Sequence, residues 1–288
     1  MVKPNAFALL LAGAVILFFV ITITLPAGGT PITPGAVPPH GLTEPQNQFD
    51  FPVAGNTLPA GDHLPLMIRW SNWQPEFGPA LVYAREQDLE GMLGMDGPVR
   101  KMLMVTSYGE AERLMTRAAE MQAAGVVIVG LNTENGLTPG DEMQTLNNPD
   151  PAVNVVARVA RLATEAGFEV IWGPVRRMTD SVSDEVIRIV MNAGVSGLAL
   201  QEQKFIEMQP AGTRLSAVNE TRERYLRLAR EVGLDAFAFH VQIMHQRCPD
   251  LENCITFVQM LEEIPVSSIA IWSNGPIPPS FVEAIRRN

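Results

Sequence analysis

Two glutamates are the residues of this chain best suited to exchange protons with a substrate. Glu134 stands in the segment LNTENG and Glu202 in LALQEQ, each soon after a short apolar run. Cleavage of a glycosidic bond uses one acid with a raised pKa and a second carboxylate as nucleophile or base, held about 5 to 10 Å apart. We expect Glu134 to be the acid and Glu202 the nucleophile or base. The alternative is that each is an ordinary solvated glutamate of a loop.

A second group of side chains could hold a polar ligand by stacking and hydrogen bonding. Tryptophan rings stack on sugars and cations, and their polar edge remains free for hydrogen bonding. The predicted substrate-binding residues are Arg69, Trp70, Tyr108, Asn132, Trp172, Arg176, Gln201, His240, Gln242, Trp272 and Asn274. For Trp172 and Trp272 the alternative is simple packing at the rim of a core. The arginines would suit an anionic group such as a uronate, and ion pairs with nearby glutamates explain them equally well.

Other chemistries have weaker support in the sequence. His240, His245 and Glu202 could together bind a metal ion, but the H-E-x-x-H spacing of established sites is missing. A hydrogen-bonded His240 lining the pocket is the preferred interpretation, and we predict no metal and no cofactor. Lys204 could form a Schiff base with a carbonyl substrate, yet its place beyond a predicted strand end fits a surface cation better.

The two cysteines, Cys248 and Cys254, stand in the segment RCPDLENC. Two ligands do not complete a zinc site, and the C-x5-C spacing is not that of a thioredoxin motif. If the folded part lies in an oxidising compartment, the pair is expected to form a disulfide that closes a small loop. Free thiols are the alternative.

These side chains must be positioned by a repeated pattern of helix, glycine and apolar strand. A helix ends most readily where the next residue can adopt a positive φ, which predicts helix ends at Gly125, Gly167, Gly194 and Gly233. Apolar runs follow each glycine, at Val126–Val129, Val170–Trp172, Gly197–Leu200 and Ala236–Val241. Because these runs are apolar at successive positions, both of their faces should be covered, as in parallel strands.

Parallel strands joined by helices form either an open doubly wound sheet or a closed barrel. Further candidate strands end near Arg69, Arg85, Thr106 and Trp272, which makes eight in all. No G-x-G-x-x-G follows a strand and no G-x-x-x-x-G-K-[ST] occurs. The sequence therefore predicts a (β/α)8 TIM barrel, with reactive groups at the carboxyl ends of the strands. The first two strands could instead form a hairpin.

The first sixty or so residues do not read as part of that barrel. Ala6–Leu25 is an apolar run of about the twenty residues that cross a bilayer as a helix, preceded by Lys3. It reads as a signal anchor or a signal peptide, and a spacer rich in proline and glycine follows. The expected domains are a signal anchor or signal peptide at 1–25, a linker at 26–62 and the barrel at 63–288.

The net charge and the N-terminal apolar segment together indicate the expected partners and location. The formal net charge is −10 at pH 7, which argues against nucleic acid as a partner. The N-terminal apolar segment predicts attachment to the membrane through the N-terminal helix, with the C-terminal domain outside the cytoplasm, or secretion if the signal is cleaved. The remaining expected partner is a glycan or another small polar ligand.

The asparagine and glutamate of LNTENG after the fourth strand and the tryptophan of IAIWSNG on the eighth resemble those of the (β/α)8 glycoside hydrolases. The resemblance is to the superfamily and covers the chain from about Leu64 to its end. It implies a barrel that acts on a glycan by carboxylate acid/base chemistry, and the N-terminal apolar segment predicts that this barrel lies outside the cytoplasm. Where relatives carry a second glutamate on the seventh strand, this chain has His240 and Gln242. Two alternatives therefore stay open: a non-catalytic glycan-binding or envelope-assembly module, and a metal-dependent hydrolase.

Overall fold

The fold was established from a computed structural model, which describes residues 64–133, 149–202, 210–247 and 251–286. All of them belong to one compact unit, Pro52–Asn288. Within these residues eight parallel strands close into a barrel in sequence order. The strands are β1 Leu66–Arg69, β2 Ala80–Arg85, β3 Val99–Val105, β4 Val126–Thr133, β5 Glu169–Pro174, β6 Val195–Gln201, β7 Ala238–Met244 and β8 Ser268–Trp272. The predicted (β/α)8 TIM barrel is thus confirmed.

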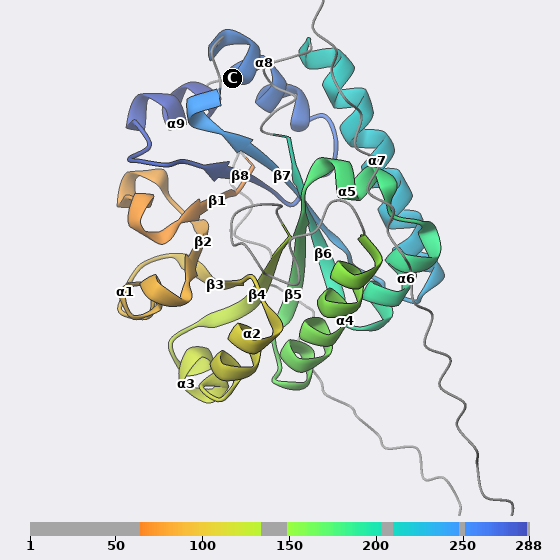
Figure 1. The fold of residues 1–288 in the computed structure, drawn as a ribbon. Coiled ribbons are helices and arrows are strands. Elements are labelled where there is room, and N and C mark those ends of the chain that lie inside the picture. The colour runs from red at the N-terminus through yellow and green to blue at the C-terminus, as the bar shows by residue number, and fades with distance from the viewer. Residues whose placement is uncertain (1–63, 134–148, 203–209, 248–250, 287–288) are drawn as a thin grey trace, which may run out of the picture. The chain divides into compact units, whose positions relative to one another are not determined.

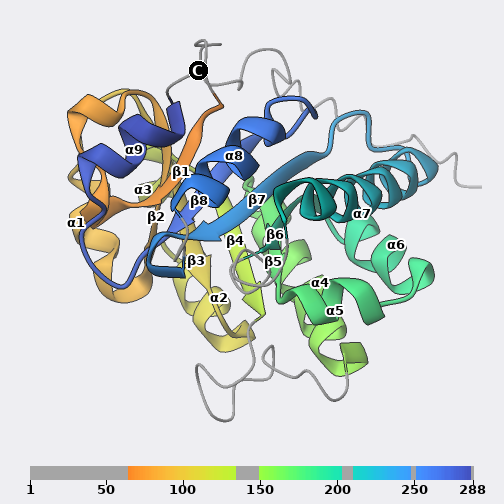
Figure 2. The same ribbon diagram turned by 90° about the horizontal axis from the view of Figure 1, so that it is seen from above.

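Helices surround the strands on the outside of the barrel (Figure 1), and the view turned by 90° places them along its flanks (Figure 2). The α-helices are α1 Leu89–Leu93, α2 Tyr108–Met115, α3 Ala118–Ala123, α4 Pro149–Glu165, α5 Arg176–Ser181, α6 Asp184–Asn192, α7 Ala211–Glu231, α8 Leu251–Leu261 and α9 Pro279–Arg286. The described ranges also contain four short 3-10 helices: η1 Trp70–Asn72, η2 Pro75–Phe77, η3 Glu86–Asp88 and η4 His245–Arg247.

The connection from β1 to β2 differs from the other crossovers because it contains only the 3-10 helices η1 and η2. The two strands nevertheless run parallel, with Leu66 opposite Ala80 and Arg69 opposite Tyr83. The alternative of an N-terminal hairpin is therefore wrong. A hairpin needs antiparallel strands, whereas these two are parallel neighbours in the barrel.

The glycine stops predicted from the sequence are confirmed. Gly125, Gly167, Gly194 and Gly233 have φ angles of 86°, 87°, 112° and 80°, in the region that side chains disfavour. At Gly194 space is also short, because a Cβ atom there would lie 2.1 Å from the Thr164 Oγ1 atom. This position between α6 and β6 thus requires glycine for two independent reasons.

Two helix starts show how well capping signals locate an element. Ser107 and Glu110 have the spacing of a capping box: the Ser107 Oγ atom accepts a hydrogen bond from the Glu110 backbone N–H, and the Glu110 carboxylate accepts one from the Thr106 N–H. Helix α6 is capped by Ser183, whose Oγ atom accepts a hydrogen bond from the Val186 N–H. Ser181 is the last residue of α5.

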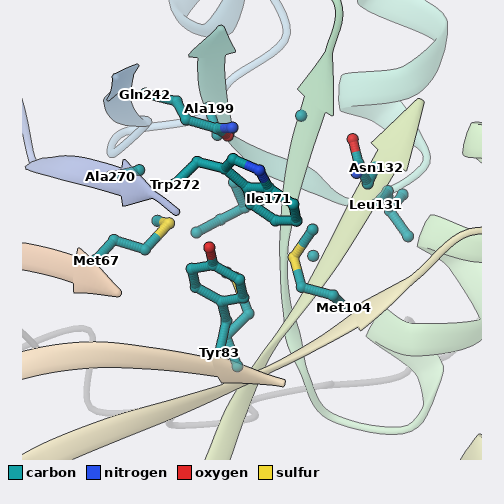
Figure 3. Close-up of a pocket in the computed structure, with 13 residues that line it drawn as sticks. Met67, Tyr83, Met104, Leu131, Asn132, Ile171, Ala199, Gln242, Ala270 and Trp272 are labelled. Atoms are coloured by element: carbon teal, nitrogen blue, oxygen red, sulfur yellow. The ribbon is translucent and has the colours of Figure 1, made fainter. Parts of the chain in front are cut away.

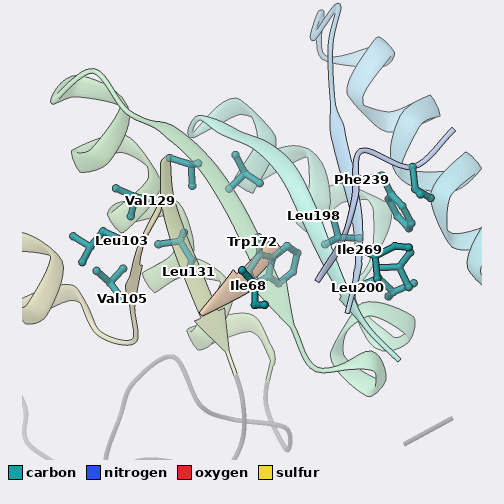
Figure 4. Close-up of a cluster of buried hydrophobic side chains, with 14 of the residues drawn as sticks. Ile68, Leu103, Val105, Val129, Leu131, Trp172, Leu198, Leu200, Phe239 and Ile269 are labelled. Carbon is teal, nitrogen blue, oxygen red and sulfur yellow. The ribbon is translucent and has the colours of Figure 1, made fainter. Parts of the chain in front are cut away.

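The apolar residues form two layers, one on each face of the barrel wall. The larger layer lies between the strands and the helices, and Figure 4 shows part of it, including Leu103, Val129, Trp172 and Leu200. The smaller layer fills the inside of the barrel with Met67, Leu81, Tyr83, Met102, Ile128, Ile171, Ala199 and Ala270. Strands covered on both faces explain why the runs in the sequence are apolar throughout.

The expected single-pass membrane location needs correction. No helix within the described ranges is long and apolar enough to cross a membrane. The segment 6–25, on which the expectation rested, lies outside the described residues, as do the linker and the predicted domain boundary at 62. Cys248 also lies outside them, so the predicted disulfide stays a prediction, while Cys254 is buried on α8.

Candidate functional site

A small pocket opens at the carboxyl ends of the strands, where the sequence predicted the site. Its cavity volume is about 30 Å³. Described residues from all eight strands line it: Met67, Tyr83, Met102, Met104, Gly130, Leu131, Asn132, Ile171, Gly173, Ala199, Gln242, Ala270 and Trp272. None of these is an aspartate, glutamate, lysine or arginine. The described wall of the pocket is therefore neutral.

Two aromatic side chains from β2 and β8 form one side of the pocket. The Tyr83 and Trp272 rings stack with their centroids 6.1 Å apart and their planes only 7° apart. Figure 3 shows the Trp272 indole above Tyr83, between Gln242 and Met104. Tyr83 is buried, whereas Trp272 is partly exposed. The stacked tyrosine therefore fixes the orientation of an indole that still has surface left for a ligand.

Amide side chains from β4 and β7 form the polar side of the pocket, and Gln201 of β6 holds the first of them in place. The Gln201 Nε2 atom donates to the Asn132 Oδ1 atom at 3.3 Å and to the Gly173 carbonyl oxygen at 3.1 Å. Asn132 and Gln201 are buried, and Gln242 is partly exposed in the pocket wall. Because Gln201 uses both amide hydrogens within the protein, Asn132 and Gln242 are the amides that face the cavity.

Three methionines line the pocket, and the sequence interpretation had missed them. Met67, Met102 and Met104 come from β1 and β3 and project to the inside of the barrel with Ile171. Tyr83 was missed as well. Inward residues alternate along a strand, so Tyr83 shares the inner face of β2 with Leu81, and Met102 lies in register with Tyr83 on β3. The sequence does not show which face is the inner one, because both faces of these strands are apolar.

Glu202 lies behind the pocket wall rather than in it. It follows the inward-facing Gln201 by one residue, and its carboxylate is directed at helices α5 and α7. The Arg176 Nη1 atom donates to Glu202 Oε1 at 2.8 Å, and the Arg214 Nη2 atom lies 3.7 Å from Glu202 Oε2. Burial raises the pKa of Glu202, although both arginines act in the opposite direction. A raised pKa suits a proton donor or a general base, and of the two roles expected for Glu202, nucleophile or base, it suits the nucleophile less.

Arg214 is the most unusual charged residue in this group. Its side chain is 1% exposed, and its guanidinium carbon lies 3.9 Å from the centroid of the Phe257 ring. Within the described structure its Nε, Nη1 and Nη2 atoms have no hydrogen-bond partner. Burial lowers its pKa to about 10. The sequence had given no reason to single out Arg214, because it stands within a helical pattern.

Several predicted binding residues lie away from the pocket. Trp172 is fully buried on the outer face of β5, where its Nε1 atom donates to Thr133 Oγ1 at 3.1 Å. Arg69 pairs with Asp88, and Trp70 packs against Gly91 of α1. Tyr108, on α2, carries the Arg158 guanidinium over its ring. Asn274 is exposed beyond the end of β8.

His240 lies inside the barrel but below the pocket, near its amino-terminal end. It is the third residue of β7 and lies in register with Ser268, the first residue of β8. Its Nδ1 atom is 2.7 Å from Ser268 Oγ, and its Nε2 atom is buried without a hydrogen-bond partner. Burial, helped by the charge of Arg100, lowers the pKa of His240 to about 4. His240 is therefore a neutral interior side chain near pH 7.

Of the two predicted glutamates, Glu134 lies outside the described residues, one position after Thr133. Lys204 also lies outside them. Of the predicted residues, the structure brings together Asn132, Gln201, Gln242 and Trp272 at the carboxyl ends of the strands. Within the described ranges no group of three or more His, Cys, Asp and Glu side chains is arranged to hold a metal ion.

Comparison with known proteins adds little to this geometry. No protein-family model and no curated protein matches the chain. Among solved structures, the chain is similar to a family 18 chitinase from Crocus vernus, with 11% identity and a TM-score of 0.47 over 77% of this chain and 96% of the other. It is also similar to a 2,3-dimethylmalate lyase of the PEP mutase/isocitrate lyase superfamily, with 11% identity and a TM-score of 0.45 over 75% and 78%.

A phosphonopyruvate hydrolase in complex with oxalate and Mg²⁺ is a third similar structure, with 15% identity and a TM-score of 0.42 over 77% of each chain. These proteins have different activities. Likeness at such identities and scores indicates no function, so the functional argument depends on the site itself.

Proposed function

We propose that this barrel binds a saccharide at the carboxyl ends of its strands. The observation that carries the proposal is the combination of a partly exposed Trp272 indole with the amides of Asn132 and Gln242 around one neutral pocket. An indole face suits the C–H face of a sugar ring, and amides can both donate to and accept from its hydroxyl groups. The ligand is proposed to be neutral, because Arg69 and Arg176 are engaged by Asp88 and Glu202.

Titration of the full-length protein with a panel of neutral saccharides tests this binding. Tryptophan fluorescence should change on addition of a bound sugar, and Trp272→Phe should abolish that change. Trp73→Phe is the matched control, because Trp73 donates to the Gly78 carbonyl oxygen and packs near Gly97, away from the pocket. Asn132→Ala and Gln242→Ala should each weaken binding about tenfold. If no saccharide produces heat in calorimetry or a fluorescence change, the proposal is wrong.

Hydrolysis of the bound glycan is a second candidate function, favoured by one observation. Burial raises the pKa of Glu202, which is the property that a general acid requires. In this version Glu202 is the acid and Glu134 supplies the second carboxylate. Binding remains the function supported best, because Glu202 is absent from the described pocket wall and is paired with Arg176.

The hydrolytic version is tested by measuring how fast the Glu202→Gln and Glu134→Gln variants release product from the bound glycan. Each change should reduce turnover at least a hundredfold while the affinity for the same saccharide stays within a few fold. Asp180→Asn is the control, because it removes the exposed partner of Arg176 and leaves Glu202 in place. Turnover that is unchanged in both glutamate variants would exclude this version and leave the binding proposal intact.

A further inference from the structure

The size of the pocket limits how much of a ligand can enter it. A cavity of about 30 Å³ holds roughly two water-sized groups. Pockets that enclose a whole small ligand are usually about 300 to 1,000 Å³. A sugar ring therefore has to lie at the entrance, against Trp272, and only a substituent of the ring can reach the cavity.

The chemistry of the inner wall restricts that substituent further. The side chains of Met67, Met102, Met104 and Ile171 make this wall mostly thioether and hydrocarbon. A thioether sulfur is a weak acceptor and donates no hydrogen bond, so a hydroxyl group placed there would lose the hydrogen bonds that it makes in water. A methyl group loses none, and it gains dispersion contacts with polarisable sulfur.

One glycine keeps the cavity open. A Cβ atom on Gly130 would lie 2.4 Å from the Met104 sulfur and 3.0 Å from the Met102 sulfur. Both atoms belong to flexible side chains, which would have to move into the neighbouring space. Glycine at the fifth position of β4 thus leaves room between the two methionines.

We propose that this pocket selects saccharides that carry a methyl-sized apolar substituent, such as a deoxy methyl, an O-methyl or an N-acetyl methyl group. The substituent enters the cavity lined by methionine, while Trp272, Asn132 and Gln242 hold the ring outside it. This selectivity rests on the proposed saccharide binding. It adds that the apolar group, and not the ring alone, determines which sugar is bound.

Calorimetric titration of the full-length protein with matched sugar pairs tests the selectivity. The pairs are 6-deoxyglucose with glucose, fucose with galactose of the same D or L configuration, 3-O-methylglucose with glucose, and N-acetylglucosamine with glucose. In at least one pair the substituted sugar should bind at least fourfold more tightly than the unsubstituted one, since one buried methylene contributes about fourfold in affinity. If the unsubstituted sugar binds as tightly in every pair, the selectivity is refuted and saccharide binding stands. If no sugar of any pair binds, both proposals fail.

A variant at Gly130 links the preference to the cavity. Gly130→Ala should reduce the affinity ratio within the preferred pair to about one. Gly109→Ala is the matched control, because a Cβ atom there meets no atom within 4 Å and the residue lies on the exposed face of α2. A ratio that is unchanged in Gly130→Ala would overturn the assignment of the cavity.

A second variant protects the test against misfolding of the first. Met104→Ala enlarges the cavity and should shift the preference of the protein to a substituent that is one carbon longer, such as O-ethyl in place of O-methyl or N-propanoyl in place of N-acetyl. An unchanged preference for the shorter substituent in a folded Met104→Ala protein would contradict the proposal. Thermal melting establishes that each variant is folded.

Discussion

Two arginines approach the same buried carboxylate in different ways, and only one of them makes a good hydrogen bond. Arg176 donates to Glu202 at 2.8 Å, whereas the Arg214 Nη2 atom lies 3.7 Å from that carboxylate and no guanidinium nitrogen of Arg214 makes a hydrogen bond within the described structure. A buried guanidinium gains little from a weak ion pair and loses its hydration, so its removal can be neutral or stabilising. The Arg176–Glu202 pair is different, because the loss of Arg176 leaves the buried Glu202 carboxylate without its hydrogen-bonded cation.

We therefore expect Arg214→Met to keep or raise the free energy of unfolding and Arg176→Met to lower it by about 3 kcal/mol. Urea unfolding at pH 7 measures both values. Methionine retains much of the volume of arginine, so the packing on Phe257 is preserved in the Arg214 variant. A loss in Arg214→Met as large as that in Arg176→Met would contradict this ranking.

His240 provides a prediction about pH. Its pKa is lowered to about 4 in the folded protein, whereas an unfolded histidine titrates near pH 6.5. Below about pH 6.5 the histidine of the unfolded chain binds a proton that His240 of the folded protein does not bind, and this favours unfolding. The free energy of unfolding therefore has its full value above that pH and decreases as the pH falls towards 4. At pH 4.5 the loss should be on the order of 2 to 3 kcal/mol.

The measurement is urea unfolding at pH 7 and pH 4.5 for the wild-type protein and His240→Leu. The variant has no imidazole to protonate and should lose less stability between the two pH values. An equal loss in both proteins would show that other groups control the acid response and would contradict the assignment to His240.

At the scale of elements, Lys101 ties two helix ends to a strand. It is 5% exposed in β3, and its Nζ atom donates to the carbonyl oxygens of Leu93, Met95 and Ala124, each at 2.9 Å. These oxygens lie at or just after the ends of α1 and α3, where a cation is favourable and intrahelical partners are lacking. One ammonium group thus satisfies three acceptors.

Lys101→Met should lower the free energy of unfolding by about 3 kcal/mol, because it leaves those carbonyl oxygens without their charged donor. Chemical unfolding measures the change. Arg113→Met is the control: Arg113 is largely exposed and pairs with Glu86 at the surface, so its loss should be below about 1 kcal/mol. Equal effects in the two variants would contradict a special role for Lys101.

The elements also explain which predictions from sequence could succeed. Glycine stops such as Gly125 and the capping box at Ser107 are local signals, and they located helix ends correctly. The direction of a side chain on a strand covered on both faces is not local. Trp172 and Trp272 both follow apolar runs, yet one faces the helices and the other faces the pocket. An all-apolar run does not reveal its inner face, and so Tyr83 and the methionines were missed.

At the scale of the whole molecule, the barrel closes where the two ends of the described chain meet. Strands β1 and β8 pair through Leu66, Met67 and Ile68 only, whereas β4 and β5 pair from Ile128 to Thr133. Across this seam the Arg286 Nη1 atom of α9 donates to the Phe77 carbonyl oxygen of η2 at 2.6 Å. Strands β5 and β6 also pair through only three residues, but only the β1–β8 pairing joins residues from distant parts of the sequence. The seam should therefore be the first part of the barrel to open.

Amide hydrogen exchange under native conditions should therefore be faster in β1 and β8 than in β4 and β5. Arg286→Met removes the contact across the seam, and it should increase exchange in β1 and β8 about fivefold, as expected for one lost hydrogen bond worth about 1 kcal/mol. Exchange in β4 and β5 should stay unchanged, because these strands open only with the whole barrel. Arg227→Met, which breaks exposed ion pairs on α7, is the control and should leave the seam unaffected. Uniform acceleration in all strands would mean instead that the barrel opens as one unit and that its seam has no separate stability.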